Sequence, residues 1–156
     1  MRDFSFCNPV RIEFGKGKEE HIGQYMKEAG AKKALVLYGS ERVRKSGLMG
    51  VVESSLKASG IEFTQLGGIK SNPVLSKVNE AIKLAKEFGA DSVLAVGGGS
   101  VLDSAKAVAA GACYEGDVWD FFTGKTPSAA LKIFDIITLA ATGSEMNCGG
   151  VVTKEQ

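Results

Sequence analysis

Strand-like and helix-like patterns of apolar residues alternate along the chain. Short runs rich in apolar and β-branched residues predict four core strands, at 34–38, 62–66, 92–96 and 133–138. Two more short strands are predicted near the start, at 4–7 and 11–14. Apolar residues at helical spacing predict helices at 19–29, around 51–58 and around 78–88. The pattern is that of a repeating strand–helix unit.

A glycine follows each of the three helical patterns, at Gly30, Gly60 and Gly89. Glycine at this place accepts the left-handed conformation that satisfies the last carbonyl groups of a helix, so we expect the helices to end there. Because parallel neighbouring strands need crossover connections, the repeat predicts an α/β fold, a Rossmann-like parallel sheet with helices on both faces. The ligand of such a sheet belongs at the carboxyl ends of its strands.

Composition and charge argue against several kinds of partner. The 156 residues carry a net charge of +1, which gives no field to hold a nucleic-acid backbone or an anionic membrane. No apolar run approaches the roughly 20 residues of a membrane span, and the first residues lack the apolar core of a signal peptide. We therefore expect a cytoplasmic protein with neither nucleic acid nor membrane as a partner.

Cysteine and histidine are too few for a metal site or a disulfide framework. Cys7, Cys113 and Cys148 are odd in number and far apart, which predicts reduced thiols. The single histidine, His21, falls in the first helical pattern and is interpreted as a half-exposed residue of the helix surface. Since histidine is the commonest general base and metal ligand, its scarcity argues against most catalytic schemes that use it.

The strongest local signal is a run of three glycines, Gly97, Gly98 and Gly99, between a predicted buried strand and a helix. Glycine costs about 0.5–1 kcal/mol more than alanine when it is ordered, so the run needs a reason. Without Cβ atoms the backbone N–H groups can approach a phosphate, and the positive end of the following helix adds to the attraction. Gly97 to Ser100 are therefore predicted to hold a pyrophosphate.

Ser100 and Asp103 also have the spacing of a capping box, in which a serine caps a helix and an acid three residues later hydrogen-bonds back to the serine N–H. For Asp103 a ligand role is equally open, because a carboxylate can orient a ribose or a nicotinamide. Lys106 is expected to do no more than pair with Asp103. The run matches neither the Gly-x-Gly-x-x-Gly fingerprint nor the Walker sequence, and alone it suits a phosphofructokinase-like kinase or a sugar-phosphate binder too.

A second motif, Thr142-Gly143-Ser144-Glu145, follows the last predicted strand. Together with Gly97-Gly98-Gly99-Ser100, Asp103 and Ala105-Lys106, it resembles the iron-dependent (group III) alcohol dehydrogenases over nearly the whole chain. Further stretches are similar to the butanol-dehydrogenase and aldehyde-reductase branch: Phe6-Cys7-Asn8-Pro9, Tyr38-Gly39, Trp119-Asp120 and Glu145-Met146-Asn147.

The resemblance implies a protein of two domains. Residues 1–156 match the NAD(P)-binding domain, and the helical domain that holds Fe²⁺ or Zn²⁺ is expected to be absent from this chain. The resemblance therefore implies no catalytic and no metal-ligating residue here, and the chain alone should be inactive. The intact enzyme would transfer hydride between NAD(P)H and a small aldehyde or alcohol, with the metal polarising the substrate oxygen, and is expected to be a homo-oligomer. A lyase of the dehydroquinate-synthase kind and a non-catalytic nucleotide or sugar-phosphate module are the alternatives.

The resemblance also implies roles for single residues. The candidate cofactor-binding set is Gly39, Ser40, Asn72, Gly97, Gly98, Gly99, Ser100, Asp103, Thr138, Thr142, Ser144 and Asn147. Gly98, Gly99 and Ser100 should contact the pyrophosphate, and Asp103 should lie near the nicotinamide or its ribose. The nicotinamide side should be lined by Thr138, Thr142 and Ser144, whereas Asn72 should face the adenosine. An ordinary turn at Asn72 and capping by Thr142 and Ser144 are the alternatives.

Residues after the first core strand bear on the choice of dinucleotide. NAD-preferring members often place an Asp where this chain has Gly39, and the absence of that carboxylate favours NADP. Arg42, Arg44 and Lys45 are candidates to meet a 2′-phosphate, although Glu41 lies among them and a basic loop is usually solvated surface. NADP is therefore our hypothesis, with NAD as the alternative.

Overall fold

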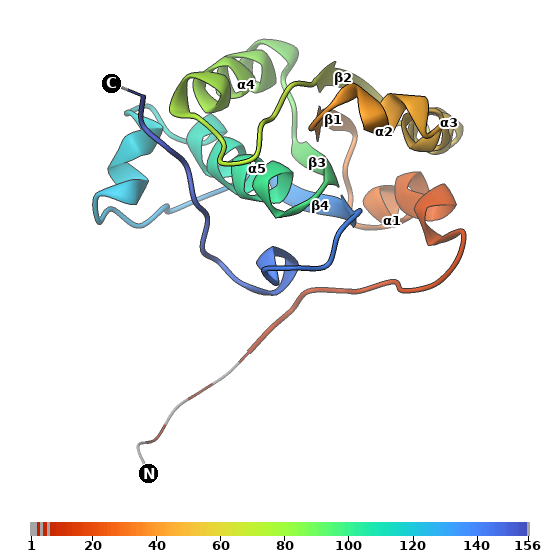
Figure 1. Ribbon diagram of the computed structural model, residues 1–156, viewed down its shortest axis with the longest axis horizontal. Coiled ribbons are helices and arrows are strands. Elements are labelled where there is room, and N and C mark those ends of the chain that lie inside the picture. Colours follow the sequence, from red (N-terminus) through yellow and green to blue (C-terminus); the bar gives the residue numbers. More distant parts are fainter. Residues whose placement is uncertain (1–2, 4, 6, 156) are drawn as a thin grey trace.

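Four parallel strands form a single twisted sheet in the computed structural model, which describes residues 3, 5 and 7–155 (Figure 1). The strands are β1 (Lys33–Tyr38), β2 (Glu62–Leu66), β3 (Ser92–Gly97) and β4 (Lys132–Ile137). Their spatial order is β2-β1-β3-β4, and all neighbours are parallel. β3 therefore lies between β1 and β4, and all six of its residues are buried.

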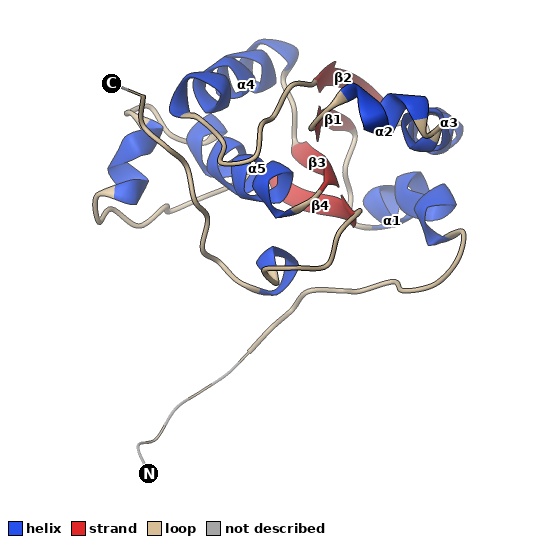
Figure 2. Cartoon of the chain, viewed as in Figure 1, coloured by secondary structure: helices blue, strands red, loops and turns tan. Residues whose placement is uncertain are grey.

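Helices cover both faces of the sheet (Figure 2). The α-helices are α1 (Ile22–Glu28), α2 (Glu41–Lys45), α3 (Leu48–Ala58), α4 (Leu75–Phe88) and α5 (Gly99–Ala112). Three 3₁₀ helices complete the described elements: η1 (Lys18–His21), η2 (Val118–Phe122) and η3 (Ser144–Met146). α4 and α5 lie on one face, and α1 and α3 lie on the other. None of the helices in the described residues is long and apolar enough to cross a membrane.

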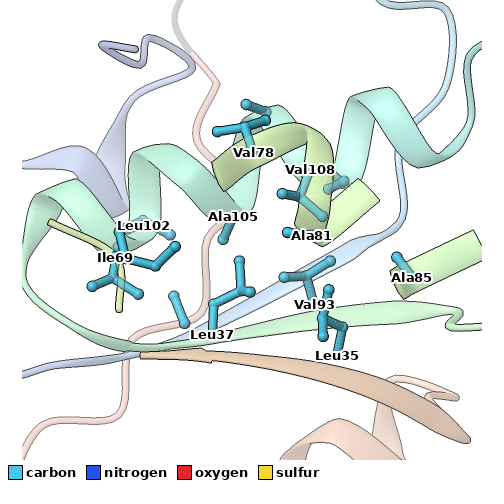
Figure 3. Close-up of a cluster of buried hydrophobic side chains, with 14 of the residues drawn as sticks. Leu35, Leu37, Ile69, Val78, Ala81, Ala85, Val93, Leu102, Ala105 and Val108 are labelled. Carbon is cyan, nitrogen blue, oxygen red and sulfur yellow. The ribbon is translucent and has the colours of Figure 1, made fainter. Parts of the chain in front are cut away.

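Two hydrophobic cores result, one on each face, because successive side chains of a strand point to opposite sides. Leu35, Leu37 and Val93 point toward α4 and α5, where they meet Ala81, Ala105 and Val108 (Figure 3). Val36, Leu94 and Val96 point toward α1 and α3. The central strands are buried on both faces, which explains their continuous apolar sequences.

The predicted fold is confirmed, and each of the four core strands begins and ends within one residue of its predicted bounds. Gly30, Gly60 and Gly89 all have positive φ, between 71° and 80°, as expected for glycines that end helices. The first predicted helix is present as η1 followed by α1, and His21 at their junction is exposed rather than half-exposed.

The predicted strand at 11–14 is wrong. The segment is exposed, pairs with no strand in the described chain, and carries Phe14 at 96% exposure. Its polar side chains bond instead to one another and to α1, with Arg11 held by Glu13 and Glu28. Of the strand predicted at 4–7, residues 4 and 6 lie outside the described residues.

The basic segment after β1 is a short helix, α2, where a solvated loop was expected. Ser40 caps it, because its side-chain oxygen accepts a hydrogen bond from the Arg42 N–H at 3.4 Å. The helix is only five residues long, too short for its apolar periodicity to be recognised in the sequence.

Candidate functional site

The glycine turn, residues 97–100, connects the end of β3 to the start of α5. Gly98 is the N-cap of α5, and its carbonyl accepts hydrogen bonds from the N–H groups of Val101 and Leu102 at 3.0 and 3.3 Å. The N–H groups of Gly99 and Ser100 find no acceptor within the described part of the chain. Free N–H groups and the positive end of a 14-residue helix therefore meet at the carboxyl edge of the sheet.

The three glycines are needed for different reasons. A Cβ atom on Gly97 would lie 2.6 Å from a methyl carbon of Val101, and one on Gly99 would lie 2.8 Å from the Thr142 hydroxyl oxygen. At Gly98, by contrast, a Cβ atom would meet no atom within 4 Å, and its φ of −88° and ψ of −173° suit any residue. The chain's own packing explains Gly97 and Gly99 but leaves Gly98 without a reason.

The capping-box interpretation of Ser100 and Asp103 is wrong. Gly98 occupies the N-cap position, no side chain caps the helix, and Ser100 lies within the first turn. The Asp103 carboxylate makes no capping bond, and one of its oxygens accepts from the Ser144 hydroxyl at 2.6 Å. Its other oxygen accepts from the Val151 N–H at 3.1 Å.

Asp103 thereby ties α5 to the polar loop, residues 138–151, which follows β4. The loop starts beside the glycine turn, because the Thr138 N–H donates to the Gly97 carbonyl at 2.9 Å. Ser144, only 3% exposed, is the buried polar residue in this loop. Capping by Ser144 is not observed, since Gly143 precedes η3 and no side chain caps it.

Lys106 is the residue that the sequence interpretation missed. Its ammonium donates to the Ser144 hydroxyl at 2.9 Å, the Asn147 side-chain oxygen at 3.1 Å and the Gly149 carbonyl at 2.7 Å. The expected pair with Asp103 is wrong, since the described residues include no such ion pair; the lysine fastens the polar loop instead. Burial lowers the pKa of Lys106, while the nearby Asp103 carboxylate acts in the opposite direction. Only the placement of the loop over α5 reveals these contacts.

Asp135, in β4, lies near Glu145 of the polar loop and Lys106 of α5. Burial and the nearby Glu145 raise the pKa of its carboxyl group, and Lys106 acts in the opposite direction. β4 and the polar loop thus bring two acids, Asp135 and Glu145, close to Lys106 of α5.

The remaining candidates lie toward β1 and β2. A Cβ atom on Gly39 would lie 3.6 Å from the same Val101 side chain that packs on Gly97, so the end of β1 adjoins the glycine turn. Ser40 caps α2. Asn72 is exposed with φ of 56°, the one positive φ outside glycine among the described residues, and it hydrogen-bonds to no other candidate there. An ordinary turn therefore accounts for its conformation.

The described residues contain no group of three or more His, Cys, Asp or Glu side chains that could hold a metal ion. Cys7, Cys113 and Cys148 are free and exposed.

Comparison with known proteins gives a consistent family. The chain is 44% identical over 154 residues to the probable NADH-dependent butanol dehydrogenase 1 of Bacillus subtilis, covering 98% of this chain and 40% of that protein. It is 36% identical over 159 residues to the NADPH-dependent aldehyde reductase of Escherichia coli, covering 99% of this chain and 40% of the relative. The chain thus spans less than half the length of these curated relatives.

A solved structure agrees with the sequence relatives. The crystal structure of NADH-dependent butanol dehydrogenase A from Thermotoga maritima matches with a TM-score of 0.95 and 52% identity, over 99% of this chain and 39% of that one. Residues 9–156 match the sequence pattern described as iron-containing alcohol dehydrogenase. The resemblance inferred from the glycine turn and the Thr142–Glu145 motif is therefore confirmed, and the chain belongs to the iron-containing alcohol dehydrogenase family.

Proposed function

We propose that residues 1–156 form the NAD(P)-binding domain of a dehydrogenase that transfers hydride between NAD(P)H and a small alcohol or aldehyde. The proposal draws on family membership and on the activities of the relatives, which depend on NADH or NADPH. In this proposal the pyrophosphate lies at the glycine turn, one half of the dinucleotide extends over β4, and the other extends over β1 and β2.

One observation carries the proposal, namely the open space above Gly98. A Cβ atom there would fill room that no atom of the chain occupies, directly beside the free N–H groups of Gly99 and Ser100. A phosphate at a helix N-terminus needs this combination of free donors and unobstructed backbone. The residues present therefore suit a dinucleotide, and Gly98, Gly99 and Ser100 would hold its pyrophosphate.

When bound, the dinucleotide would supply hydride transfer: the carbinol carbon of an alcohol loses a hydride to NAD(P)⁺ and the hydroxyl proton goes to solvent, which yields an aldehyde, NAD(P)H and H⁺, or the reverse. The chain's own contribution is to orient the dinucleotide. Asp103, Ser144 and Asn147 have their side chains engaged within the polar loop, so we assign them to shaping the nicotinamide side. Thr138 and Thr142 complete that side.

The metal of the family does not fit the residues described here, because they offer no ligand cluster. We place the ligands of Fe²⁺ or Zn²⁺ outside residues 1–156 and derive no step through the metal. As part of the same proposal, the intact protein is a cytoplasmic homo-oligomer.

Calorimetric titration of this chain with NAD⁺ and NADP⁺ tests the proposal. We expect binding of at least one dinucleotide, its loss in Gly98→Val, and no turnover of alcohol by the chain alone. Gly50→Val is the matched control, since Gly50 lies exposed within α3 and a Cβ atom there also meets nothing within 4 Å. Binding that survives Gly98→Val, or absence of binding by the parent chain, would overturn the proposal.

A further inference from the structure

Arg44, in α2, has a guanidinium group held in one place by neutral partners. Its Nε donates to the Tyr38 hydroxyl at 2.8 Å, and a terminal nitrogen donates to the side-chain oxygen of Gln65. Its central carbon lies 5.0 Å from the centre of the Tyr38 ring, within the range of a cation–π contact. The three contacts fix both the position and the plane of the group.

The partners of Arg44 are themselves anchored. Tyr38 is 7% exposed and packs in the core beneath α1 and α3. Gln65, in β2, uses its amide nitrogen to donate to Glu53 of α3 at 2.7 Å, so its oxygen is directed at Arg44. An exposed arginine with this much support is preorganised, because folding rather than ligand binding bears the entropic cost of ordering its side chain.

The charge of Arg44 is left without a direct counter-ion. Glu41 and Glu53 lie near enough to help raise its pKa, after the larger effect of the Tyr38 hydrogen bond. Neither carboxylate comes within ion-pair distance of it in the described structure. Two hydrogen bonds leave most of the five N–H donors of a guanidinium available, and a planar guanidinium suits a phosphate.

The strand order places Arg44 at the adenosine end of the proposed site. The pyrophosphate would lie over the end of β3, and the polar loop marks the nicotinamide side beyond β4. The adenosine half must then cross the ends of β1 and β2, and these are the strands that supply Tyr38 and Gln65.

We propose that Arg44 is the residue that selects a 2′-phosphate on the adenosine ribose, so that the domain prefers NADP over NAD. This inference rests on the proposed function. The named relatives include both NADH- and NADPH-dependent proteins, so family membership leaves the choice to local residues. Of the three basic residues considered for the 2′-phosphate, Arg44 alone is held in place, since Arg42 and Lys45 have no side-chain partner among the described residues.

The test compares Arg44→Met with Arg42→Met and Lys45→Met, which remove the same charge from the same short helix. Dissociation constants for NAD⁺ and NADP⁺ are measured by calorimetry at fixed ionic strength, together with those for 2′-AMP and 5′-AMP. We expect Arg44→Met to lower the preference for NADP⁺ by about tenfold, the worth of a charged hydrogen bond, with the constant for NAD⁺ unchanged. The two controls should change it far less, and Arg44→Lys should restore part of it.

The outcomes separate this inference from the proposed function. Parent chain that binds NAD⁺ as tightly as NADP⁺, or a preference unaffected by Arg44→Met, would overturn the role of Arg44 while leaving the dinucleotide site intact. A loss equal in all three variants would overturn it too, since it would indicate net charge rather than a specific contact. Failure to bind either dinucleotide would overturn the proposed function itself. Thermal unfolding confirms that each variant is folded.

Discussion

The glycine turn and the polar loop meet at the same edge of the sheet, yet different forces hold them in place. The turn continues a strand that is buried along its whole length, and Gly97 packs directly on Val101 four residues later. The loop is largely exposed, contains one short 3₁₀ helix, and is held by side chains of α5 that are 38 to 48 residues away in sequence.

This difference teaches which half of the site is preformed. Apolar packing of β3 and α5 fixes the half proposed to bind the phosphates, whose geometry follows from a strand, three glycines and a helix start. The half proposed to face the nicotinamide depends on Asp103 and Lys106 of α5, whose side chains hydrogen-bond to the polar loop. Disturbing the first half should chiefly lower global stability, whereas disturbing the second should cost less stability and act mainly by loosening the loop.

The largest effect on stability is expected at the glycine turn, where Gly97 is required by packing and Gly98 is proposed to face the ligand. Gly97→Ala should lower the free energy of unfolding by about 1–3 kcal/mol, because its methyl group would overlap Val101. Gly98→Ala should leave that energy unchanged or slightly higher, since its backbone suits alanine and the space is open. Urea denaturation measures both, and equal losses at the two positions would contradict the distinction.

A smaller effect is expected when the loop is released. Lys106→Met removes three hydrogen bonds to the loop and should lower the free energy of unfolding by about 1–2 kcal/mol. The clearer signal is faster hydrogen exchange at the Val151 amide, measured by mass spectrometry. Lys83→Met is the control, because Lys83 is exposed on α4 and makes only a long, solvent-exposed ion pair with Glu87 at 3.8 Å. Its loss should change the free energy of unfolding by no more than about 0.5 kcal/mol. Unaltered exchange in Lys106→Met would show that the lysine does not hold the loop.

The smallest effect on stability is expected from the titration of Asp135. The folded chain raises the pKa of Asp135 above its ordinary value of 3.8, so the folded state binds the proton more readily than the unfolded state. Stability from this group is complete at low pH and declines as the pH rises through the window between 3.8 and the raised pKa. Asp135→Asn should remove that decline and stabilise the chain at neutral pH by at most about 1 kcal/mol. Unfolding curves from pH 3 to 7 check it, and parallel curves for parent and variant would refute it.

Much of the fold could be predicted because its signals are local. β1 and β3 are apolar along nearly their whole length, and Gly30, Gly60 and Gly89 mark where helices end. The errors came where a local pattern lacked tertiary support. The alternation at 11–14 resembles a strand, but a strand needs a neighbour, and none lies beside it in the described structure. α2 is too short to show a period.

The sequence by itself determined the layered α/β fold, the glycine turn between a strand and a helix and, through two motifs in order, the family. Those features are written in neighbouring residues, whose spacing reports periodicity, turns and helix starts. Tertiary structure alone decided which glycine is open to a ligand, that Asp103 and Lys106 bind the polar loop rather than each other, and that Tyr38 and Gln65 hold Arg44. The partners in these contacts come from different strands and helices, and only the packing of those elements brings the atoms within hydrogen-bonding distance.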